Sequence, residues 1–82
     1  MLTPSKSDCI AILTAAARVN GGSDVVRLSY QNLGLSRNSL DATATFLMER
    51  GCFLRCRGAQ GDYEVGGLSL QGRLRLDQLV HG

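Results

Sequence analysis

The sequence lacks the features that mark a membrane protein or a secreted protein. Its 82 residues contain no apolar run approaching the roughly 20 positions that a membrane helix requires. The first seven residues lack the basic stretch followed by an apolar stretch that is typical of a secretory signal. We therefore expect a cytoplasmic protein that has no membrane partner.

Cysteine and histidine are also scarce. Three cysteines, Cys9, Cys52 and Cys56, are an odd number and too few for a disulfide scaffold, so we expect all three to be reduced. A zinc site needs about four ligands, and the other strong candidate is His81. On one extended strand Cys52 and Cys56 would lie roughly 13 Å apart, too far for one tetrahedral ion. A single histidine supplies no nucleophile and base pair, so the sequence predicts no enzyme, metal or cofactor.

Charge of one sign is limited as well. Nine basic residues against seven acidic ones give a net charge of +2, which by itself does not indicate nucleic-acid binding. Apolar residues make up 44% of the chain, which predicts one small domain over residues 1–82. A chain of this length buries only about 60% of its unfolded surface, so we expect low stability.

The first part of the chain alternates helical and β-prone segments. Thr3 followed by Pro4 predicts the start of a helix over 4–20, which the glycines after Asn20 end. A short strand is predicted over 25–28 and a short helix over 30–33. The apolar arc of the first helix is wide enough to indicate a central position or contact with a second copy, and it consists of Cys9, Ile12, Leu13, Ala16 and Val19, widened by Ile10 and Ala17.

A longer helix is predicted over 37–50, capped by Ser36 and ended by Gly51. At 100° per residue its two faces differ in chemistry, and Phe46 lies on the border between them. The core face consists of Leu40, Thr43, Ala44 and Leu47, with Met48 at its edge, and the polar face consists of Arg37, Asn38, Asp41, Thr45 and Glu49.

Alternation of period two predicts a hairpin over 53–65 around a four-residue loop at 58–61. In that register Arg57 faces Asp62 and Arg55 faces Glu64 on a charged side. The other side of the hairpin is apolar and carries Leu54, Cys56, Tyr63 and Val65.

The last segment fits two structures. Leu68, Leu70, Leu74 and Leu76 alternate like a strand, whereas Ser69 can cap a helix over 70–80, which we prefer. Such a helix carries apolar residues on several sides, which favours a partner such as a second copy.

The order of these elements resembles that of a winged helix-turn-helix domain. The segment LGLSRNSL at 33–40 resembles the turn and the start of the recognition helix in winged-helix regulators, and LMERGCFL at 47–54 resembles the passage into the wing. The segment LSLQGR at 68–73 is similar to the start of the terminal helix in MarR-like proteins, and 20–53 also resembles small winged-helix proteins of plasmids and integrative elements. The resemblance implies an α+β fold of three helices, a two- to three-stranded antiparallel wing and a short C-terminal helix.

The resemblance also implies a function, sequence-specific binding of double-stranded DNA by a homodimeric transcriptional regulator. Helix 37–50 would enter the major groove, where arginine reads guanine, asparagine or threonine reads adenine or the thymine methyl, and aspartate accepts from cytosine. The serines and the wing arginines would contact phosphates, and a glutamine at the wing tip could enter the minor groove. The expected DNA-contacting residues are Ser36, Arg37, Asn38, Ser39, Asp41, Thr45, Arg55, Arg57 and Gln60.

Other features favour a different function. Asp41 and Glu49 would repel phosphate, and the wing arginines face acids in the predicted hairpin. Each expected contact residue also fits an ordinary solvated surface position. The alternative is a winged-helix module that binds another protein within a larger complex and does not bind DNA.

Overall fold

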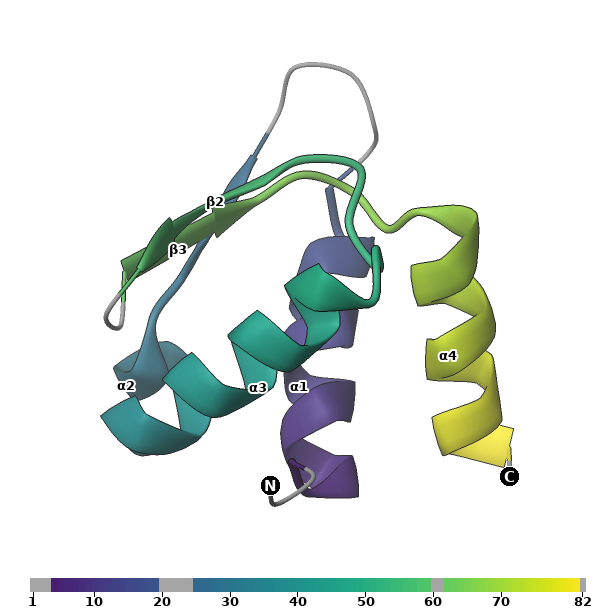
Figure 1. The fold of residues 1–82 in the computed structure, drawn as a ribbon. Coiled ribbons are helices and arrows are strands. Elements are labelled where there is room, and N and C mark those ends of the chain that lie inside the picture. Colours follow the sequence, from purple (N-terminus) through teal and green to yellow (C-terminus); the bar gives the residue numbers. More distant parts are fainter. Residues whose placement is uncertain (1–3, 20–24, 60–61, 82) are drawn as a thin grey trace.

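The computed structural model describes residues 4–19, 25–59 and 62–81. Within those residues the chain forms an α+β fold with four helices and a small, open, antiparallel sheet of three strands, an arrangement compatible with a winged helix (Figure 1). The elements in chain order are α1 (Lys6–Ala17), β1 (Val26–Leu28), α2 (Tyr30–Leu33), α3 (Arg37–Glu49), β2 (Cys56–Ala59), β3 (Asp62–Val65) and α4 (Leu70–His81).

Helix α1 is shorter than the predicted 4–20. Its N-cap is Ser5, whose hydroxyl accepts from the backbone N–H of Asp8 at 3.2 Å, so the helix begins at Lys6 after Pro4. Capping by Thr3, and a helix end at Asn20, fall on residues outside the described ranges. The helix ends at Ala17, because Arg18 and Val19 bond in the tighter i to i−3 pattern of a final turn.

Helix α3 packs against α1 with the face that the sequence predicts. The helix ends at Glu49, and Gly51 follows with a φ of 69°, the left-handed conformation that glycine supplies at helix ends. In α1 the buried arc is narrower than predicted, because Val19 is only half-buried and Ala17 is exposed. The buried residues of α1 are Cys9, Ile12, Leu13 and Ala16, and those of α3 are Leu40, Thr43, Ala44 and Leu47.

The sheet has the strand order β1-β3-β2, and its hairpin register differs from the predicted one. Arg57 pairs with Glu64 and Cys56 with Val65, a shift of two residues. The shift arises because Gly58 is a strand residue opposite Tyr63 and not part of the loop. It has a φ of 122°, and a Cβ there would overlap the carbonyl oxygen of Asp62, so glycine allows the close approach of the strands.

A shift of two residues keeps each side chain on its predicted side of the sheet, because the side-chain period is two. Tyr63 and Val65 are buried as expected. Leu54 and Cys56, which were also expected on the apolar side, are exposed. Strand β2 begins only at Cys56, and before it Phe53 makes an isolated bridge with Leu68, so Leu54 lies in a bend at the surface.

The terminal segment is the helix α4, as preferred from the sequence. Ser69 caps it by accepting from the N–H of Gly72 at 3.1 Å, and the Ser69 hydroxyl donates to the Gly51 carbonyl at 2.5 Å. Gly72 is buried, and a Cβ there would overlap the carbonyl oxygen of Cys52, so the first turn of α4 packs directly on the backbone after α3. Among the described helices, none has the length and apolar character needed to cross a membrane.

Candidate nucleic-acid interface

The N-terminal turn of α3 lies at the surface and is closed by two serines. Ser36 is the N-cap, and its Oγ accepts from the backbone N–H of Ser39 at 3.1 Å. The Ser36 hydroxyl also donates to the Ser39 Oγ at 2.9 Å. The two serines among the predicted phosphate contacts thus lie together at one helix end, where they cap the first turn.

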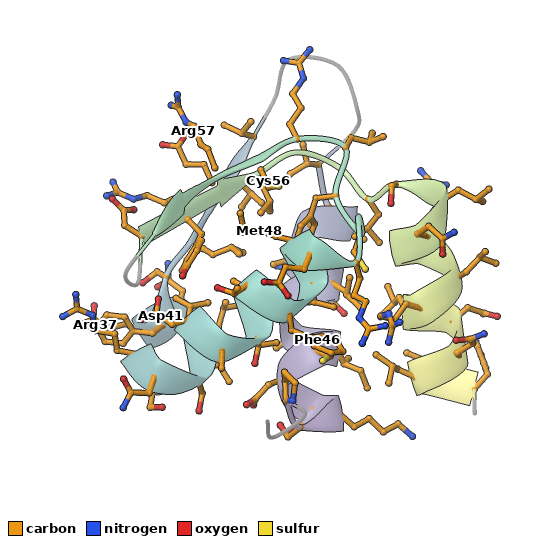
Figure 2. The ribbon with its side chains drawn as sticks, viewed as in Figure 1. Arg37, Asp41, Phe46, Met48, Cys56 and Arg57 are labelled. Atoms are coloured by element: carbon orange, nitrogen blue, oxygen red, sulfur yellow. The ribbon has the colours of Figure 1, made fainter. Side chains whose placement is uncertain are left out.

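Arg37 and Asn38 follow the cap and are exposed. Figure 2 shows Arg37 at the outer end of α3. Thr45 and Glu49 are exposed further along the same helix. At 100° per residue the outermost line of α3 contains Asn38, Thr45 and Glu49, while Arg37 lies toward the sheet. The surface of α3 that would meet a DNA groove therefore carries Arg37 at its edge and the carboxylate of Glu49 near the C-terminal end of the helix.

Asp41 connects α3 to the sheet. The hydroxyl of Tyr63, which is only 4% exposed, donates to the Asp41 Oδ1 at 2.8 Å. The bond joins the half-buried Asp41 carboxylate of α3 to β3. As a base contact Asp41 would have to share its oxygens with Tyr63. Sequence reasoning missed this bond, because it depends on how β3 lies against α3.

A shallow hollow separates α3 from the hairpin, and Thr45 lies at its edge. In Figure 2 Met48 of α3 and Cys56 of β2 lie on the sides of α3 and the hairpin that face each other. The hollow is open to solvent and mixes apolar and polar groups. Its lining residues are Thr45, Met48, Glu49, Cys56, Gly58 and Tyr63.

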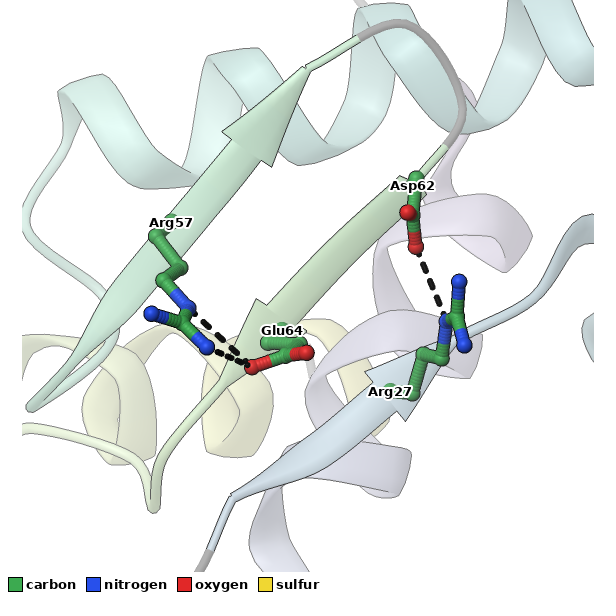
Figure 3. Close-up of polar contacts among 4 residues, drawn as sticks. All are labelled: Arg27, Arg57, Asp62 and Glu64. Atoms are coloured by element: carbon green, nitrogen blue, oxygen red, sulfur yellow. Dashed lines mark hydrogen bonds and ion pairs between the residues drawn. The ribbon is translucent and has the colours of Figure 1, made fainter.

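Of the two predicted wing arginines, Arg57 pairs with an acid, though not with the predicted one, and Arg27 of β1 pairs with another. The Nε and Nη2 of Arg57 donate to the Glu64 Oε2 at 3.1 and 2.9 Å (Figure 3). Asp62 accepts from the Nε of Arg27 at 2.9 Å, a contact across β1 and β3 that raises the pKa of the Arg27 guanidinium. The predicted Arg57–Asp62 and Arg55–Glu64 pairs do not form, because the register differs by two residues.

Arg55 lies in the bend before β2 and is exposed, and within the described residues it forms no ion pair. Gln60, the residue predicted at the wing tip, lies outside the described residues. The sheet therefore carries two arginines that form ion pairs, Arg57 and the unpredicted Arg27. Arg55 lies outside the strands, in the bend before β2.

A second pair of arginines lies on the opposite side of α3. The guanidinium carbon of Arg50 is 4.8 Å from the centroid of the Phe46 ring, and that of Arg75 from α4 is 5.6 Å from the same centroid. Both distances are in the range of cation–π contacts. The spacing of Phe46 and Arg50, four residues apart on one helix, could have indicated half of this cluster from the sequence.

Two buried thiols lie near this cluster. Burial raises the pKa of the Cys9 and Cys52 thiols, and the positive charge of Arg75 partly opposes that rise. Cys56, by contrast, is exposed on the sheet side, and all three cysteines are free.

No group of three or more histidine, cysteine or acidic side chains suited to a metal ion occurs among the described residues. His81, the other ligand considered from the sequence, lies 3.5 Å from Asp77 of the same helix, and both side chains are exposed. This pair is an ordinary i, i+4 contact on the outside of α4.

The local geometry thus offers an exposed helix start, a hairpin beside it and two separate groups of arginines. Comparisons of the chain with protein-family models, curated proteins and solved structures gave no match.

Proposed function

We propose that this protein is a winged-helix DNA-binding protein that regulates transcription as a homodimer. The observation that carries the proposal is the exposed start of α3, with Arg37 and Asn38 directly after the Ser36 cap. The β2–β3 hairpin packs beside this helix through the Tyr63–Asp41 bond. A helix of 13 residues is about 20 Å long and fits the major groove, while the hairpin would follow the adjacent backbone.

In this arrangement Arg37 reads a guanine, Asn38 an adenine, and Thr45 a base or thymine methyl deeper in the groove. Ser36, Ser39, Arg55 and Arg57 contact phosphates. Arg57 does so only by loosening its bonds to Glu64, which are exposed enough to exchange with solvent.

The homodimer is supported by the outer face of α4. Leu70, Leu74 and Val80 are 73%, 51% and 55% exposed. In Figure 1 α4 lies at the end of the molecule away from α2 and the start of α3, so a contact there leaves the DNA-facing side open. A net charge of +2 per chain gives each copy few phosphate contacts. Two copies bound to one duplex would double the number of arginines that contact phosphates and so raise the affinity.

The test is binding to duplex DNA by fluorescence anisotropy at several salt concentrations, on a mixed-sequence duplex and on a site selected from a random library. Arg37→Ala should weaken binding to the selected site by about 1–3 kcal/mol and relax the preference at one base pair. Arg18→Ala, at the end of α1, is the matched control and should leave that preference unchanged. Absence of binding to any duplex near 50 mM salt would refute the proposal, since counterion release favours binding most strongly there.

A second candidate is a protein-interaction module with the same fold. Two observations favour it, the carboxylate of Glu49 on the outer line of α3 and the acid partners of Arg27 and Arg57. For this candidate a defined protein partner would be recovered and Arg37→Ala would leave its binding intact, whereas duplex DNA would not bind.

A further inference from the structure

The side of α3 that faces α4 carries a group of positive charge that the proposed base contacts do not use. Arg50 follows the last residue of α3, and Arg75 lies in the middle of α4. Their guanidinium carbons lie 4.8 and 5.6 Å from the centroid of one ring, that of Phe46. Figure 2 shows Phe46 on the α4 side of α3, away from the hollow beside Cys56.

Among the residues that the structure describes, these two cations have no acid partner. Within the described residues neither Arg50 nor Arg75 forms an ion pair, although Arg27 and Arg57 on the sheet each do. Arg75 is half-buried, is hydrogen-bonded to the Cys52 side chain and also acts electrostatically on the Cys9 thiol, but both thiols are neutral at neutral pH and supply no counter-charge. A partly desolvated guanidinium without a carboxylate lacks the counter-charge that such groups normally have.

The acids near this group do not supply that counter-charge. Glu49 precedes Arg50 but lies about 100° away around the helix, on the outer line. Asp77 occupies the outer side of α4 beside His81. Asp8 of α1 acts on Cys9 but forms no ion pair with either arginine. On α4, the residues three and four positions from Arg75 are Gln71, Gly72, Gln78 and Leu79, none of which carries a negative charge.

The ring of Phe46 also reduces the freedom of both side chains. An arginine that rests on an aromatic face loses less conformational entropy when it binds a ligand than one that moves freely in solvent. Both guanidinium groups lie beside one ring, and guanidinium N–H donors are the groups that recognise phosphate in proteins.

We propose that Arg50, Arg75 and Phe46 form a phosphate-binding site between α3 and α4. The phosphate is either that of the DNA backbone, beyond the groove that α3 enters, or that of a free phosphorylated compound. In its DNA form the site rests on the function proposed above. Arg50 and Arg75 are then the residues that fix the far end of α3 on the duplex, while Arg37 reads bases at its start.

The first experiment measures DNA affinity against salt concentration for Arg50→Gln, Arg75→Gln and the double variant. Each phosphate contact contributes about 0.9 to the slope of log affinity against log salt, so the double variant should lower that slope by about 1 to 2. Near 100 mM salt its affinity should fall about tenfold or more, on selected and mixed duplexes alike. Arg18→Gln, which removes the same charge from the end of α1, is the control, and circular dichroism checks that each variant is folded.

The second experiment titrates inorganic phosphate and pyrophosphate into the protein while the arginine Nε–H signals are followed by NMR. The site predicts shifts of the Arg50 and Arg75 signals that saturate, and smaller shifts for Arg18. A lowered salt slope in the variants assigns the phosphate to DNA. Saturating shifts with an unchanged slope assign it to a free phosphorylated compound.

The two experiments also separate this site from the proposed function. If no duplex binds but phosphate shifts the two arginine signals, DNA binding fails and the phosphate site stands. If DNA binds with an unchanged slope in the double variant and phosphate shifts neither signal, the site is overturned while DNA binding stands.

Discussion

The two sides of α3 hold their arginines in different ways. On the sheet side Arg27 and Arg57 are paired across strands with Asp62 and Glu64. On the α4 side Arg50 and Arg75 rest on Phe46 and have no acid partner within the described residues. A net charge of +2 therefore conceals an uneven distribution: on the α4 side two arginines share one ring and have no acid partner within the described residues, whereas on the sheet side Arg27 and Arg57 are paired and Arg55 is not.

The burial of the cysteine thiols also differs between the two sides of α3. Cys56 on the sheet side is exposed, whereas Cys9 and Cys52 on the α4 side are buried. The α4 side is thus a packed junction of three helices with two arginines beside it, and the sheet side is an open surface on which Arg27 and Arg57 are paired with acids. Each of the following changes alters one side and leaves the other in place.

The largest effect is expected for Gly72→Ala. Its Cβ would overlap the Cys52 carbonyl oxygen, so α4 would have to move away from the backbone after α3. We expect a loss of about 2–4 kcal/mol in the free energy of unfolding, measured with urea. Gln71→Ala, at the exposed neighbouring position, should change it by less than about 0.5 kcal/mol. Equal stabilities of the two variants would contradict the close packing of α4.

Tyr63→Phe tests the sheet side. The change removes the hydroxyl that donates to Asp41 and leaves a half-buried carboxylate without that bond. We expect a loss of about 1–2 kcal/mol in the free energy of unfolding. Tyr30→Phe, at an exposed position, should leave stability unchanged. A Tyr63→Phe variant as stable as the parent protein would show that the bond does not fix α3 to β3.

The buried thiols predict a loss of stability at alkaline pH. Burial raises the folded pKa of Cys9 and Cys52 above the ordinary thiol value of 9.0, so the unfolded chain loses these protons first, near that pH. The stabilisation is complete below that pH and is lost as the pH rises through the folded values, at no more than about 1.4 kcal/mol per pH unit for each thiol.

Urea unfolding at several pH values between neutral and about 10, under reducing conditions, measures this decline. Cys52→Ala removes one of the two thiols and should make the decline shallower. A decline that is equally steep in the variant would show that other groups cause it.

The smallest effect is expected for Glu64→Gln, which releases Arg57 on the sheet side. If DNA binds, its affinity at low salt should rise about two- to fivefold, because a matched arginine becomes available to phosphate. Asp77→Asn removes the same charge from the outer side of α4 and should have a smaller effect. An equal rise in both variants would mean that only net charge matters and that the pairing of Arg57 does not.

Much of the fold follows from local patterns. The core face of α3, Leu40 to Leu47, is the predicted one, because helical periodicity alone decides which side chains share a face. The helix α4 follows from the Ser69 cap, and Gly51 ends α3 as glycine does at many helix ends. Of the candidate contact residues, Ser36, Ser39, Arg37 and Asn38 do lie together at one helix start.

The contacts between elements could not be derived in the same way. Glycine is common in loops, so the sequence places Gly58 in the hairpin loop. In the structure Gly58 is a strand residue, because its backbone packs closely against that of Asp62. Because Gly58 is in the strand, Arg57 pairs with Glu64 and not with Asp62. Asp62 instead pairs with Arg27, which lies 35 positions earlier in the sequence. Leu54 was expected on an apolar face and is exposed, because β2 begins after it.

The order of the elements, the serine caps of α3 and α4 and the buried face of α3 were encoded locally, since backbone propensity and side-chain period act within a few residues. The strand register, the Tyr63–Asp41 bond and the meeting of Arg50 and Arg75 on Phe46 were decided by the tertiary structure. Each of them joins residues from different elements, and their distance depends on how those elements pack, which no local pattern specifies.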